Sequence, residues 1–426
     1  MGKPLACILT GLLLLPLAAC GDSGSSNSSA RGDGQKLTVW IMEGTNPDST
    51  AYFTQVKEAF KAKTGAELDV QLVPWASAKD KFTTAIAGGT TPDVAEVGTT
   101  WTPEFADVGA LADLTARVRD AGLADDLVDG LRDAGTLEGK LYGMPWYAGV
   151  RAVLYDKEVF ARSGITSPPA TWAEFAEAVT KVKSHQPGIV PFAVPGSSEF
   201  TAVPFIWGAG GELAVKEGDR WRSRINSPES VAGITFLTDL AVKQQASTPA
   251  AATWNEKDVL AAYAKGGVAM IVSGSWTPPT LTKDAPEVAA RTGAFPIPGK
   301  DGMARSFTGG SHLAVFEKST KKDLAFELVR LMTTGDLATR WGKESTYFPG
   351  TKSLVGKLGD QEKLTKVFVE QFTRGGKTVP VTPAWGKVQG KKVVPTMMQS
   401  ILSGKATVQQ AADQAAKDMD EVFAAK

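Results

Sequence analysis

Tryptophan is the residue type whose number and spacing first point to chemistry in this chain. The 426 residues include 11 tryptophans. Several adjoin Gly, Pro, Ser, Thr or Asn instead of lying inside periodic apolar segments, namely Trp101, Trp146, Trp254, Trp276 and Trp385. An indole at a loop position offers a large apolar face, which suits stacking on the C–H faces of carbohydrates. Ordinary core packing is an equal alternative for any one ring, because burying an aromatic side chain is favourable anywhere.

Catalytic and metal-binding patterns are sparse in the sequence. The two histidines, His185 and His312, lack the context of a metal site or a catalytic triad, and no Gly-x-Ser-x-Gly elbow or EF-hand loop occurs. A glycoside hydrolase is the alternative of a different class; it needs two carboxylates about 5–10 Å apart. Glu43, Glu104 and Glu199 are candidates. The sequence favours binding over catalysis, and we expect no enzyme activity, metal or cofactor.

The charge composition excludes some classes of partner. Lys plus Arg and Asp plus Glu number 46 each, so the formal net charge is zero. This balance offers no positive excess for nucleic acid or an anionic surface. The length suits about two domains of ~100–200 residues each, and no repeat of solenoid period is visible.

Residues 1–19 have the organisation of an export signal. A lysine near the start precedes an apolar stretch over 5–17, which is shorter than the ~20 residues that span a bilayer. Small residues then precede Cys20. This resembles a bacterial lipoprotein signal, in which the Cys sulfur is acylated and the chain is cut before it; an ordinary secretory signal is the alternative. The Gly- and Ser-rich residues 20–35 predict a flexible tether.

Strand-like and helix-like segments alternate in the first hundred residues. Strands are predicted over 36–42, 68–73 and 93–97, and helices from about 49 and over 79–87. This order is typical of a parallel, doubly wound sheet, in which ligands bind beyond the carboxyl ends of the strands. The polar loop 43–48 and the pair Thr100-Trp101 follow two such ends.

The rest of the chain is also of mixed α/β type. Gly, Pro and aromatic residues gather just before a predicted strand at 150–155, which indicates a crossing between two lobes. Further strands are predicted over 268–272 and 311–316, and helices over 104–111, 124–134, 172–183, 228–245, 258–265, 321–333, 393–402 and 408–424.

An ordered series of short motifs follows the predicted first strand and its polar loop. The motifs are 87–94 (AGGTTPDV), 109–114 (GALADL), 139–145 (GKLYGMP), 153–157 (VLYDK), 266–270 (GGVAM) with 274–276 (GSW), and 326–332 (FELVRLM). Together they resemble the maltose-type (family 1) extracellular solute-binding lipoproteins of bacterial ABC sugar importers. Within that family, 98–105 (GTTWTPEF) and 40–46 (WIMEGTN) look most like the actinobacterial chitobiose and chito-oligosaccharide binders.

The resemblance implies a two-lobed, periplasmic-binding-protein-like α/β fold of type II, each lobe a sheet flanked by helices. It places an N-terminal lobe at 36–147 and 311–349 and a C-terminal lobe at 148–310 and 350–426. Hinge crossings are then expected near 146–150, 308–311 and 348–352, with the sugar held between the lobes.

The resemblance also implies a ligand site of hydrogen-bonding and aromatic side chains. Its members are Glu43, Thr45, Asn46, Asp48, Thr100, Trp101, Trp146, Tyr147, Arg151, Ser275, Trp276, Gly310 and Trp385. Glu43 and Asp48 are equally expected to cap the following helix, and the alternative for Arg151 is a solvated or salt-bridged surface position. Trp40 and Trp172 are expected in the core.

The implied role is that of a lipid-anchored binding component on the extracellular face of a bacterial cell membrane of Gram-positive type. It would capture an oligosaccharide, with chitobiose or a chito-oligosaccharide expected first, and deliver it to ABC permease subunits. An α-glucoside or another disaccharide, such as maltose or trehalose, is the alternative ligand. We expect a monomer, with Cys20 carrying the membrane anchor.

Overall fold

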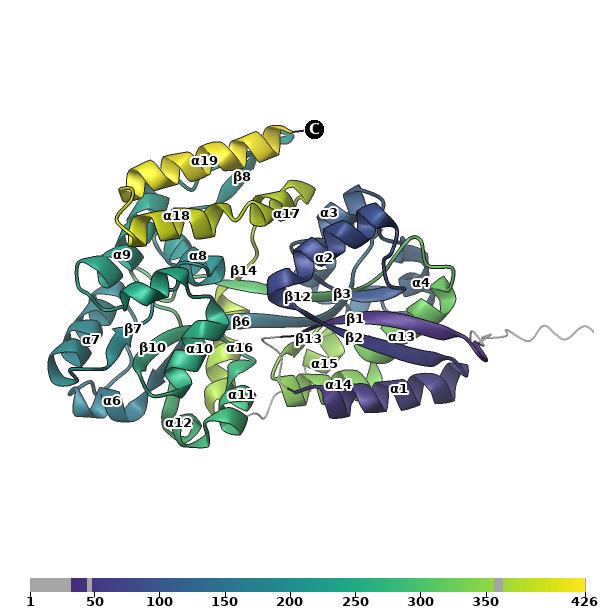
Figure 1. Ribbon diagram of the computed structural model, residues 1–426, viewed down its shortest axis with the longest axis horizontal. Coiled ribbons are helices and arrows are strands. Elements are labelled where there is room, and N and C mark those ends of the chain that lie inside the picture. The colour runs from purple at the N-terminus through teal and green to yellow at the C-terminus, as the bar shows by residue number, and fades with distance from the viewer. Residues whose placement is uncertain (1–31, 44–47, 356–362, 426) are drawn as a thin grey trace, which may run out of the picture.

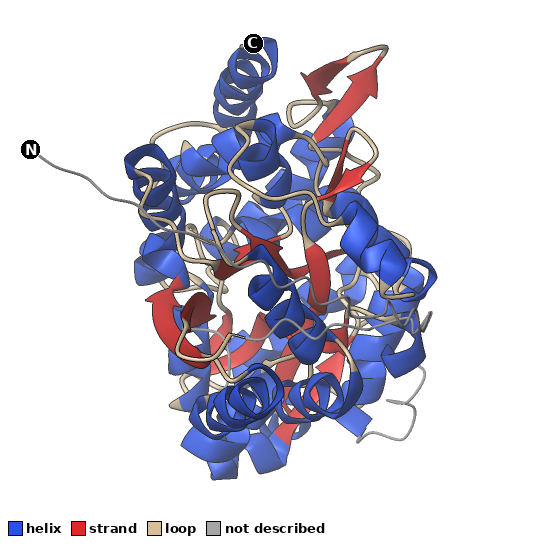
Figure 2. Ribbon diagram, turned by 90° about the vertical axis from the view of Figure 1, so that its right-hand side faces the viewer, coloured by secondary structure: helices blue, strands red, loops and turns tan. Residues whose placement is uncertain are grey.

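The computed structural model describes residues 32–43, 48–355 and 363–425, which form two lobes on either side of a shared group of strands (Figure 1). The predicted residues Cys20, Thr45 and Asn46 lie outside this part of the chain. Strands run through the interior and helices cover the outside (Figure 2). Within the described residues no helix is both long and apolar enough to cross a membrane.

The first lobe is built on three parallel strands, as the sequence predicted. β1 (Lys36–Glu43) lies between β2 (Glu67–Pro74) and β3 (Val94–Gly98). The apolar strand residues pack against helices on both faces of the sheet. These helices are α1 (Thr50–Thr64), α2 (Trp75–Gly88), α3 (Thr102–Asp107), α13 (Lys322–Thr333) and α14 (Gly335–Ser345).

Two long strands join the lobes. β12 (Ser306–Val315) runs antiparallel to β3 in the first lobe, and β6 (Met144–Asp156) runs antiparallel to β12. Farther along, β6 pairs with β10 (Val268–Gly274) and β11 (Thr292–Phe295) of the second lobe. The short β13 (Phe348–Pro349) also pairs with β6, so three segments meet where the lobes join. The lobe boundaries themselves stay a prediction.

The second lobe surrounds the far half of β6. Its strands include β7 (Val190–Phe192), the hairpin β8 (Ala214–Glu217) with β9 (Arg220–Ser223), and β14 (Gly376–Lys377). Its helices before β12 are α6 (Lys157–Arg162), α7 (Trp172–His185), α8 (Glu199–Gly208), α9 (Pro228–Val242), η2 (Pro249–Thr253), α10 (Glu256–Ala264), α11 (Thr277–Asp284) and α12 (Pro286–Arg291). The later helices are α16 (Lys363–Gly375), α17 (Pro383–Gly390), α18 (Val393–Leu402) and α19 (Val408–Ala424). The short α15 (Lys352–Val355) follows β13 and hydrogen-bonds to Asp126 and Asp129.

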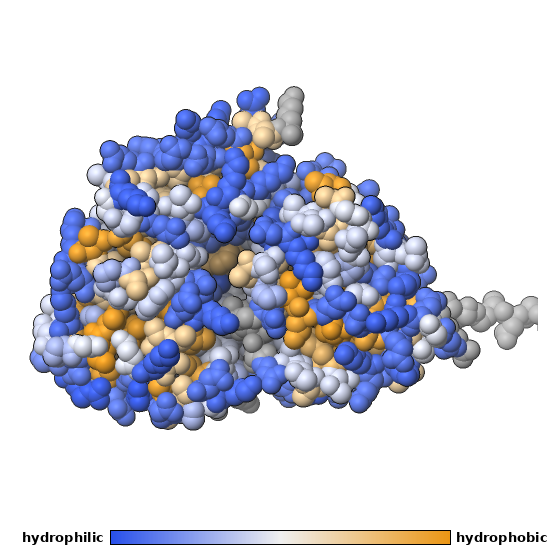
Figure 3. Space-filling model, viewed as in Figure 1, coloured by the Kyte–Doolittle hydropathy of each residue, from blue (hydrophilic) through white to orange (hydrophobic). Residues whose placement is uncertain are grey.

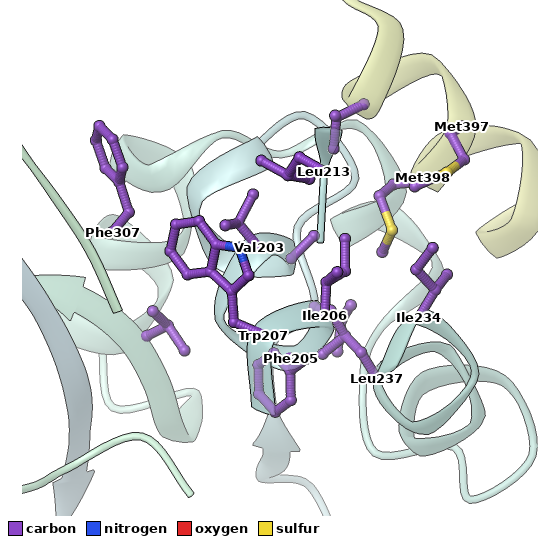
Figure 4. Close-up of a cluster of buried hydrophobic side chains, with 14 of the residues drawn as sticks. Val203, Phe205, Ile206, Trp207, Leu213, Ile234, Leu237, Phe307, Met397 and Met398 are labelled. Atoms are coloured by element: carbon purple, nitrogen blue, oxygen red, sulfur yellow. The ribbon is translucent and has the colours of Figure 1, made fainter. Parts of the chain in front are cut away.

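A large apolar core holds the second lobe together. Phe205, Trp207, Leu237 and Met398 lie side by side in it, brought together by α8, α9 and α18 (Figure 4). Trp172 packs flat on Phe236 of α9, with ring centroids 4.2 Å apart. In the first lobe Trp40 is buried next to Phe82. The core position predicted for Trp40 is therefore confirmed, whereas Trp172 is only partly buried and packs against the edge of the core.

The structure departs from the sequence prediction in some elements. The helix predicted over 124–134 is broken into η1 (Ala124–Asp126) and α5 (Asp129–Ala134), because Val128 between them is extended. The sequence did not predict α8: this helix is apolar on every side and contains Pro204, so it has no helical periodicity to detect. The short elements α4 (Thr115–Asp120), β4 (Thr136–Leu137) and β5 (Lys140–Leu141) were also missed.

A candidate ligand-binding cleft between the lobes

A cavity of about 240 Å³ lies where the two lobes meet, and the surface is hollowed at this position (Figure 3). The walls of the cavity include the carboxyl ends of three strands. Trp75 follows β2, and Trp276 follows β10. The segment Thr99 to Trp101 follows β3. The edge that the sequence singled out is therefore part of the cavity. The lining residues are Trp75, Gly98, Thr99, Thr100, Trp101, Tyr147, Arg151, Phe200, Glu256, Trp276, Phe307, Gly309, Gly310, Ser311, Tyr347 and Gln389.

Aromatic rings reach this cavity from both lobes. Trp75 and Trp101 form a pair in the first lobe, with centroids 5.5 Å apart and planes tilted by 59°. Trp276 enters from the second lobe and lies 5.3 Å from Tyr347. Aromatic side chains of both lobes therefore line the cavity, and an aromatic ring suits stacking on a sugar.

Two glycines allow Trp276 to lie close to the crossing strands. A Cβ on Gly274 would stand 2.2 Å from the Trp276 ring, and one on Gly149 of β6 would stand 2.7 Å from it. Gly149 and Gly274 therefore leave the space that the indole fills, and a larger residue would displace it.

Arg151 of β6 is buried in the wall of the cavity beside the first turn of α10. Its Nε lies 2.7 Å from Oε1 of Glu256, and its Nη2 lies 3.1 Å from Oε2. The guanidinium also lies over Phe200 and Trp276, 4.6 Å and 5.0 Å from the ring centroids. Two expectations for Arg151 came from the sequence, a ligand-site position and a position on the surface. Arg151 lines the cavity and forms a salt bridge, but it is buried and does not lie on the surface.

The carboxyl of Glu199 lies behind Gln389 in the same wall. The Nε2 of Gln389 donates a hydrogen bond to Glu199, and Gln389 itself lines the cavity. Burial of the Glu199 carboxyl raises its pKa to about 7, although the hydrogen bond from Gln389 lowers it. Neutral and charged forms of Glu199 therefore coexist near neutral pH.

Glu96 of β3 lies beneath the floor of the cavity and is fully buried. Its Oε1 accepts hydrogen bonds from Ser311 Oγ at 2.6 Å and from the Tyr147 hydroxyl, while its Oε2 accepts one from Met42 N at 2.8 Å. Burial raises the pKa of Glu96 to about 7, against the lowering effect of these three donors. The carboxyl thus ties β1, β6 and β12 together under the ligand site.

His312 is a structural residue in this structure. Its Nδ1 lies 2.8 Å from Thr102 Oγ1, and its Nε2 lies 2.9 Å from the Leu131 carbonyl oxygen, so the ring donates from Nε2 and accepts at Nδ1. Burial lowers the pKa of His312 to about 4, which keeps the ring neutral at neutral pH. Among the described residues no group of three or more His, Cys, Asp or Glu side chains is placed to hold a metal ion.

The cavity brings together six of the residues that the sequence named: Thr100, Trp101, Tyr147, Arg151, Trp276 and Gly310. Gly310 must be small, because a Cβ would stand 1.9 Å from the Tyr147 carbonyl oxygen. Glu43 ends β1 and is half-buried outside the lining. Asp48 accepts hydrogen bonds from the N–H and hydroxyl of Thr50, the first residue of α1, but the N-cap position is Ser49 and not Asp48. Asp48 also lies 3.1 Å from Lys283 of α11 in the opposite lobe.

The structure does not bring three other predicted residues into the lining. Trp146 stacks on Trp341 in the core of the first lobe, with centroids 5.0 Å apart, at a point where the pairing of β6 with β12 is irregular. Trp385 is 1 % exposed and packs in the core of the second lobe. Ser275 is buried; its N–H donates a hydrogen bond to the Val150 carbonyl oxygen at 3.0 Å, and its own carbonyl oxygen accepts one from the hydroxyl of Thr346.

Sequence reasoning missed several lining residues. Trp75 could have been found, because it follows the end of a predicted strand just as Trp101 does. Glu256 begins α10 and resembles an ordinary first-turn acid, so nothing local marks it. The remaining missed side chains are Thr99, Phe200, Phe307, Ser311, Tyr347 and Gln389, which the fold brings together.

Fold and site together define a two-lobed binding protein with its ligand cleft between the lobes. The model of the bacterial extracellular solute-binding protein family matches residues 44–336, which is more than half of the chain. The chain therefore belongs to this family. The two-lobed α/β fold expected from the sequence is confirmed.

Relatives of known identity agree with this assignment. The diacetylchitobiose-binding protein DasA of Streptomyces coelicolor is 30% identical over 411 residues, which cover 95% of this chain and 94% of that protein. A solute-binding protein of Thermotoga lettingae, solved with α-D-tagatose bound, is 26% identical with a TM-score of 0.82, covering 92% of this chain and 100% of that one. The GacH receptor of Streptomyces glaucescens, 22% identical, has the same fold, with a TM-score of 0.80 over 91% and 98% of the two chains.

Proposed function

We propose that this chain is the sugar-binding component of a bacterial ABC importer and that its ligand is diacetylchitobiose or a related chito-oligosaccharide. The observation that carries the proposal is the meeting of Trp75 and Trp101 from one lobe with Trp276 from the other across a single cavity. We propose this particular sugar because the relative DasA is a diacetylchitobiose-binding protein. The family supplies the extracellular, solute-binding role.

The residue types of the cavity suit a sugar. Its aromatic rings offer faces for the C–H surfaces of the pyranose, and Arg151, Glu256 and Gln389 offer donors and acceptors to hydroxyl or acetamido groups. Hydrogen bonds to charged groups contribute about 1.5–3 kcal/mol each, so a few of them together with stacking offset the loss of ligand freedom.

Closure of the lobes on the ligand is the expected mode of capture. Asp48 of the first lobe pairs with Lys283 of the second, and Gly386 of α17 lies against Glu104 of α3, so the lobes touch beside the cavity. A ligand stabilises this arrangement only by contacting both lobes. The closed form is then the one that the permease recognises, and the binding protein acts as a monomer.

The hydrolase alternative finds less support in the cavity. Glu256 is the one carboxylate among its described lining residues, and it is engaged by Arg151. A glycosidase needs two carboxylates about 5–10 Å apart on the cleft. The chain's relatives are likewise solute-binding proteins.

The proposal includes anchoring on the outer face of the cell membrane of a Gram-positive bacterium. Cys20 follows a signal-like stretch and precedes a Gly- and Ser-rich tether. Acylation of the Cys20 sulfur with two chains would hold the protein stably on the membrane.

A ligand screen tests the proposal. The protein without residues 1–19 is heated with and without diacetylchitobiose, N-acetylglucosamine, maltose, trehalose, cellobiose and xylobiose. A ligand that binds the folded state raises the melting temperature according to its concentration relative to Kd. We expect the largest shift with diacetylchitobiose. A larger shift with maltose or trehalose would move the assignment to the alternative ligand class, and no shift with any sugar would refute the proposed function.

A further inference from the structure

We propose that Arg151 selects the acetamido group of the sugar: one edge of its guanidinium is held by Glu256, and the other edge donates to the acetamido carbonyl oxygen. The inference rests on the proposed function, because it names the group on the sugar that this wall of the cavity recognises. Glu256 orients Arg151 and is in this sense a positioning residue.

The guanidinium of Arg151 keeps donors that the protein does not use. It carries five N–H bonds, and two of them, one on Nε and one on Nη2, are directed at the Glu256 carboxylate. Three remain, two on Nη1 and one on Nη2, and these form no hydrogen bond with the described residues. The free end of the guanidinium is therefore a fork of donors whose orientation is fixed by the bonds to Glu256.

The free end of the guanidinium is accessible from the cavity. Several polar side-chain atoms of the described residues are enclosed and without a hydrogen-bond partner, but Nη1 of Arg151 is not one of them. Since Nη1 has no partner among these residues, it must have exposed surface. The Arg151 side chain is 8 % exposed and lines the cavity. Its exposed part thus includes the nitrogen that Glu256 does not engage.

The surroundings of the guanidinium strengthen a hydrogen bond from this end. Its Cζ lies over the rings of Phe200, Trp276 and Phe307, at 4.6, 5.0 and 5.4 Å from their centroids. Apolar rings on several sides limit the access of water, so a charged donor gains more from a ligand oxygen here than it would in solvent.

The charges in this wall favour a neutral ligand group. The Glu256 carboxylate compensates the Arg151 charge. Burial raises the pKa of Glu199 to about 7, and the nearby charges of Arg151 and Glu256 act on it in opposite directions. The three side chains together are thus neutral or negative, so an anionic sugar gains no net attraction. An ammonium group would meet the N–H bonds of the free end and be repelled.

The balance of donors and acceptors favours a carbonyl oxygen over a hydroxyl. A sugar hydroxyl brings a proton that needs an acceptor, whereas the Glu256 oxygens already accept from Arg151 and from Ser198 Oγ. An acetamido carbonyl oxygen brings no proton and has two lone pairs for the fork. The group that best matches the free end of Arg151 is therefore the acetamido carbonyl.

The test compares three disaccharides that share a β-1,4 linkage and differ only in the group at C2 of each ring. They are diacetylchitobiose (acetamido), its deacetylated form (ammonium) and cellobiose (hydroxyl), titrated by calorimetry into the protein without residues 1–19. We expect diacetylchitobiose to bind about 10- to 100-fold more tightly than the other two, as the loss of a hydrogen bond to a charged group predicts. Equal affinity for the three sugars overturns only this inference, whereas the absence of any sugar binding overturns the proposed function as well.

Two variants test whether Arg151 is the source of this preference. Arg151→Lys keeps a cation for Glu256 but loses the fork, so the preference should fall to about threefold or less. Arg151→Met/Glu256→Gln removes the donors without leaving an uncompensated charge, and the same loss of preference is expected. Circular dichroism identifies the variants that fold, and an intact preference in either folded variant overturns the proposal.

Matched variants test the other side chains of the cavity. Trp101→Ala should weaken the binding of all three sugars while keeping their ratio, because a stacked ring contacts the face of the sugar and not the group at C2. Gln389→Leu should also keep the ratio, although Gln389 is a polar lining residue of the same wall. Loss of the preference in Gln389→Leu and its retention in Arg151→Lys would assign the acetamido group to Gln389 and overturn the proposal.

Discussion

The guanidinium of Arg151 donates two hydrogen bonds to the carboxylate of Glu256, from Nε to Oε1 at 2.7 Å and from Nη2 to Oε2 at 3.1 Å, in a wall where both side chains are largely buried. One partner comes from the strand that crosses between the lobes and the other from the first turn of α10. The ion pair thus holds the Arg151 guanidinium over the rings of Trp276 and Phe200, at the boundary between the protein core and the cavity.

Removing one partner of this pair is expected to destabilise the protein strongly. Glu256→Gln leaves the Arg151 charge buried without compensation, and such changes lower the free energy of unfolding by about 3–5 kcal/mol. Urea denaturation measures this loss. The double variant Arg151→Gln/Glu256→Gln should lose less stability than the sum of the losses in the two single variants, because the double variant leaves no uncompensated charge. Strict additivity would show that the two groups do not interact.

The tryptophans should separate into ligand-contacting and structural residues. Trp101→Ala removes a ring that is partly exposed in the cavity, so we expect sugar affinity to fall about tenfold or more with little change in stability. Trp385→Ala should lower the free energy of unfolding by about 3–5 kcal/mol, because this ring is 1 % exposed in the core. Calorimetry and urea denaturation of both variants check the distinction. Loss of binding in Trp385→Ala without loss of stability would return that residue to the role predicted from the sequence.

Gly274 should be required for the position of Trp276. A methyl group there would stand 2.2 Å from the indole, so Gly274→Ala is expected to displace the ring and weaken sugar binding about as much as Trp276→Ala does. Gly130→Ala is the matched control, since a Cβ at Gly130 in α5 meets nothing within 4 Å. Tryptophan fluorescence and sugar titration report the two effects. Normal binding by Gly274→Ala would show that the cleft tolerates a moved indole.

His312 should make stability fall in acid. Its pKa is about 4 in the folded protein and about 6.5 when unfolded, so the neutral ring favours folding above pH 6.5. This contribution, about 3 kcal/mol, is lost as the pH falls from 6.5 to about 4. The raised pKa values of Glu96 and Glu199 act in the opposite direction, so the wild-type profile alone does not isolate His312.

Comparison with a variant isolates the effect of His312. His312→Gln keeps a side chain able to donate to the Leu131 carbonyl oxygen and to accept from Thr102, but it does not titrate in this range. The difference in unfolding free energy between wild type and His312→Gln should therefore shrink as the pH falls from 6.5 to 4. A difference that is constant over this range would contradict the neutral, buried assignment of the ring.

Cys20 should determine whether the protein stays with the cell. Expressed from its full sequence in a Gram-positive host, the wild type is expected in the membrane fraction with a diacylglyceryl group on Cys20, detected by mass spectrometry of the N-terminal peptide. Cys20→Ser should be found in the medium, or retained with an uncleaved signal. An unmodified wild-type protein in the medium would favour the ordinary secretory signal.

Local patterns were enough to predict the elements that carry the fold. The alternation of apolar strands and periodic helices predicted the parallel arrangement of β1, β2 and β3. This was possible because the spacing of apolar residues differs between helices and strands. The rule that ligands bind beyond strand ends pointed to Thr100 and Trp101, and both residues line the cavity. α8 escaped prediction because a helix buried on all sides has no amphipathic period.

The sequence by itself determined the family, the two-lobed α/β fold and the chemical character of the cleft, because motif order and residue type are properties of the chain alone. Only the tertiary structure decided which aromatic rings face the cavity. Trp146 and Tyr147 are neighbours on β6 and pack against each other in one apolar cluster, with ring centroids 4.9 Å apart, yet only Tyr147 also lines the cavity. Likewise, Glu96, Tyr147 and Ser311 lie far apart in sequence and meet only because β3, β6 and β12 pair side by side.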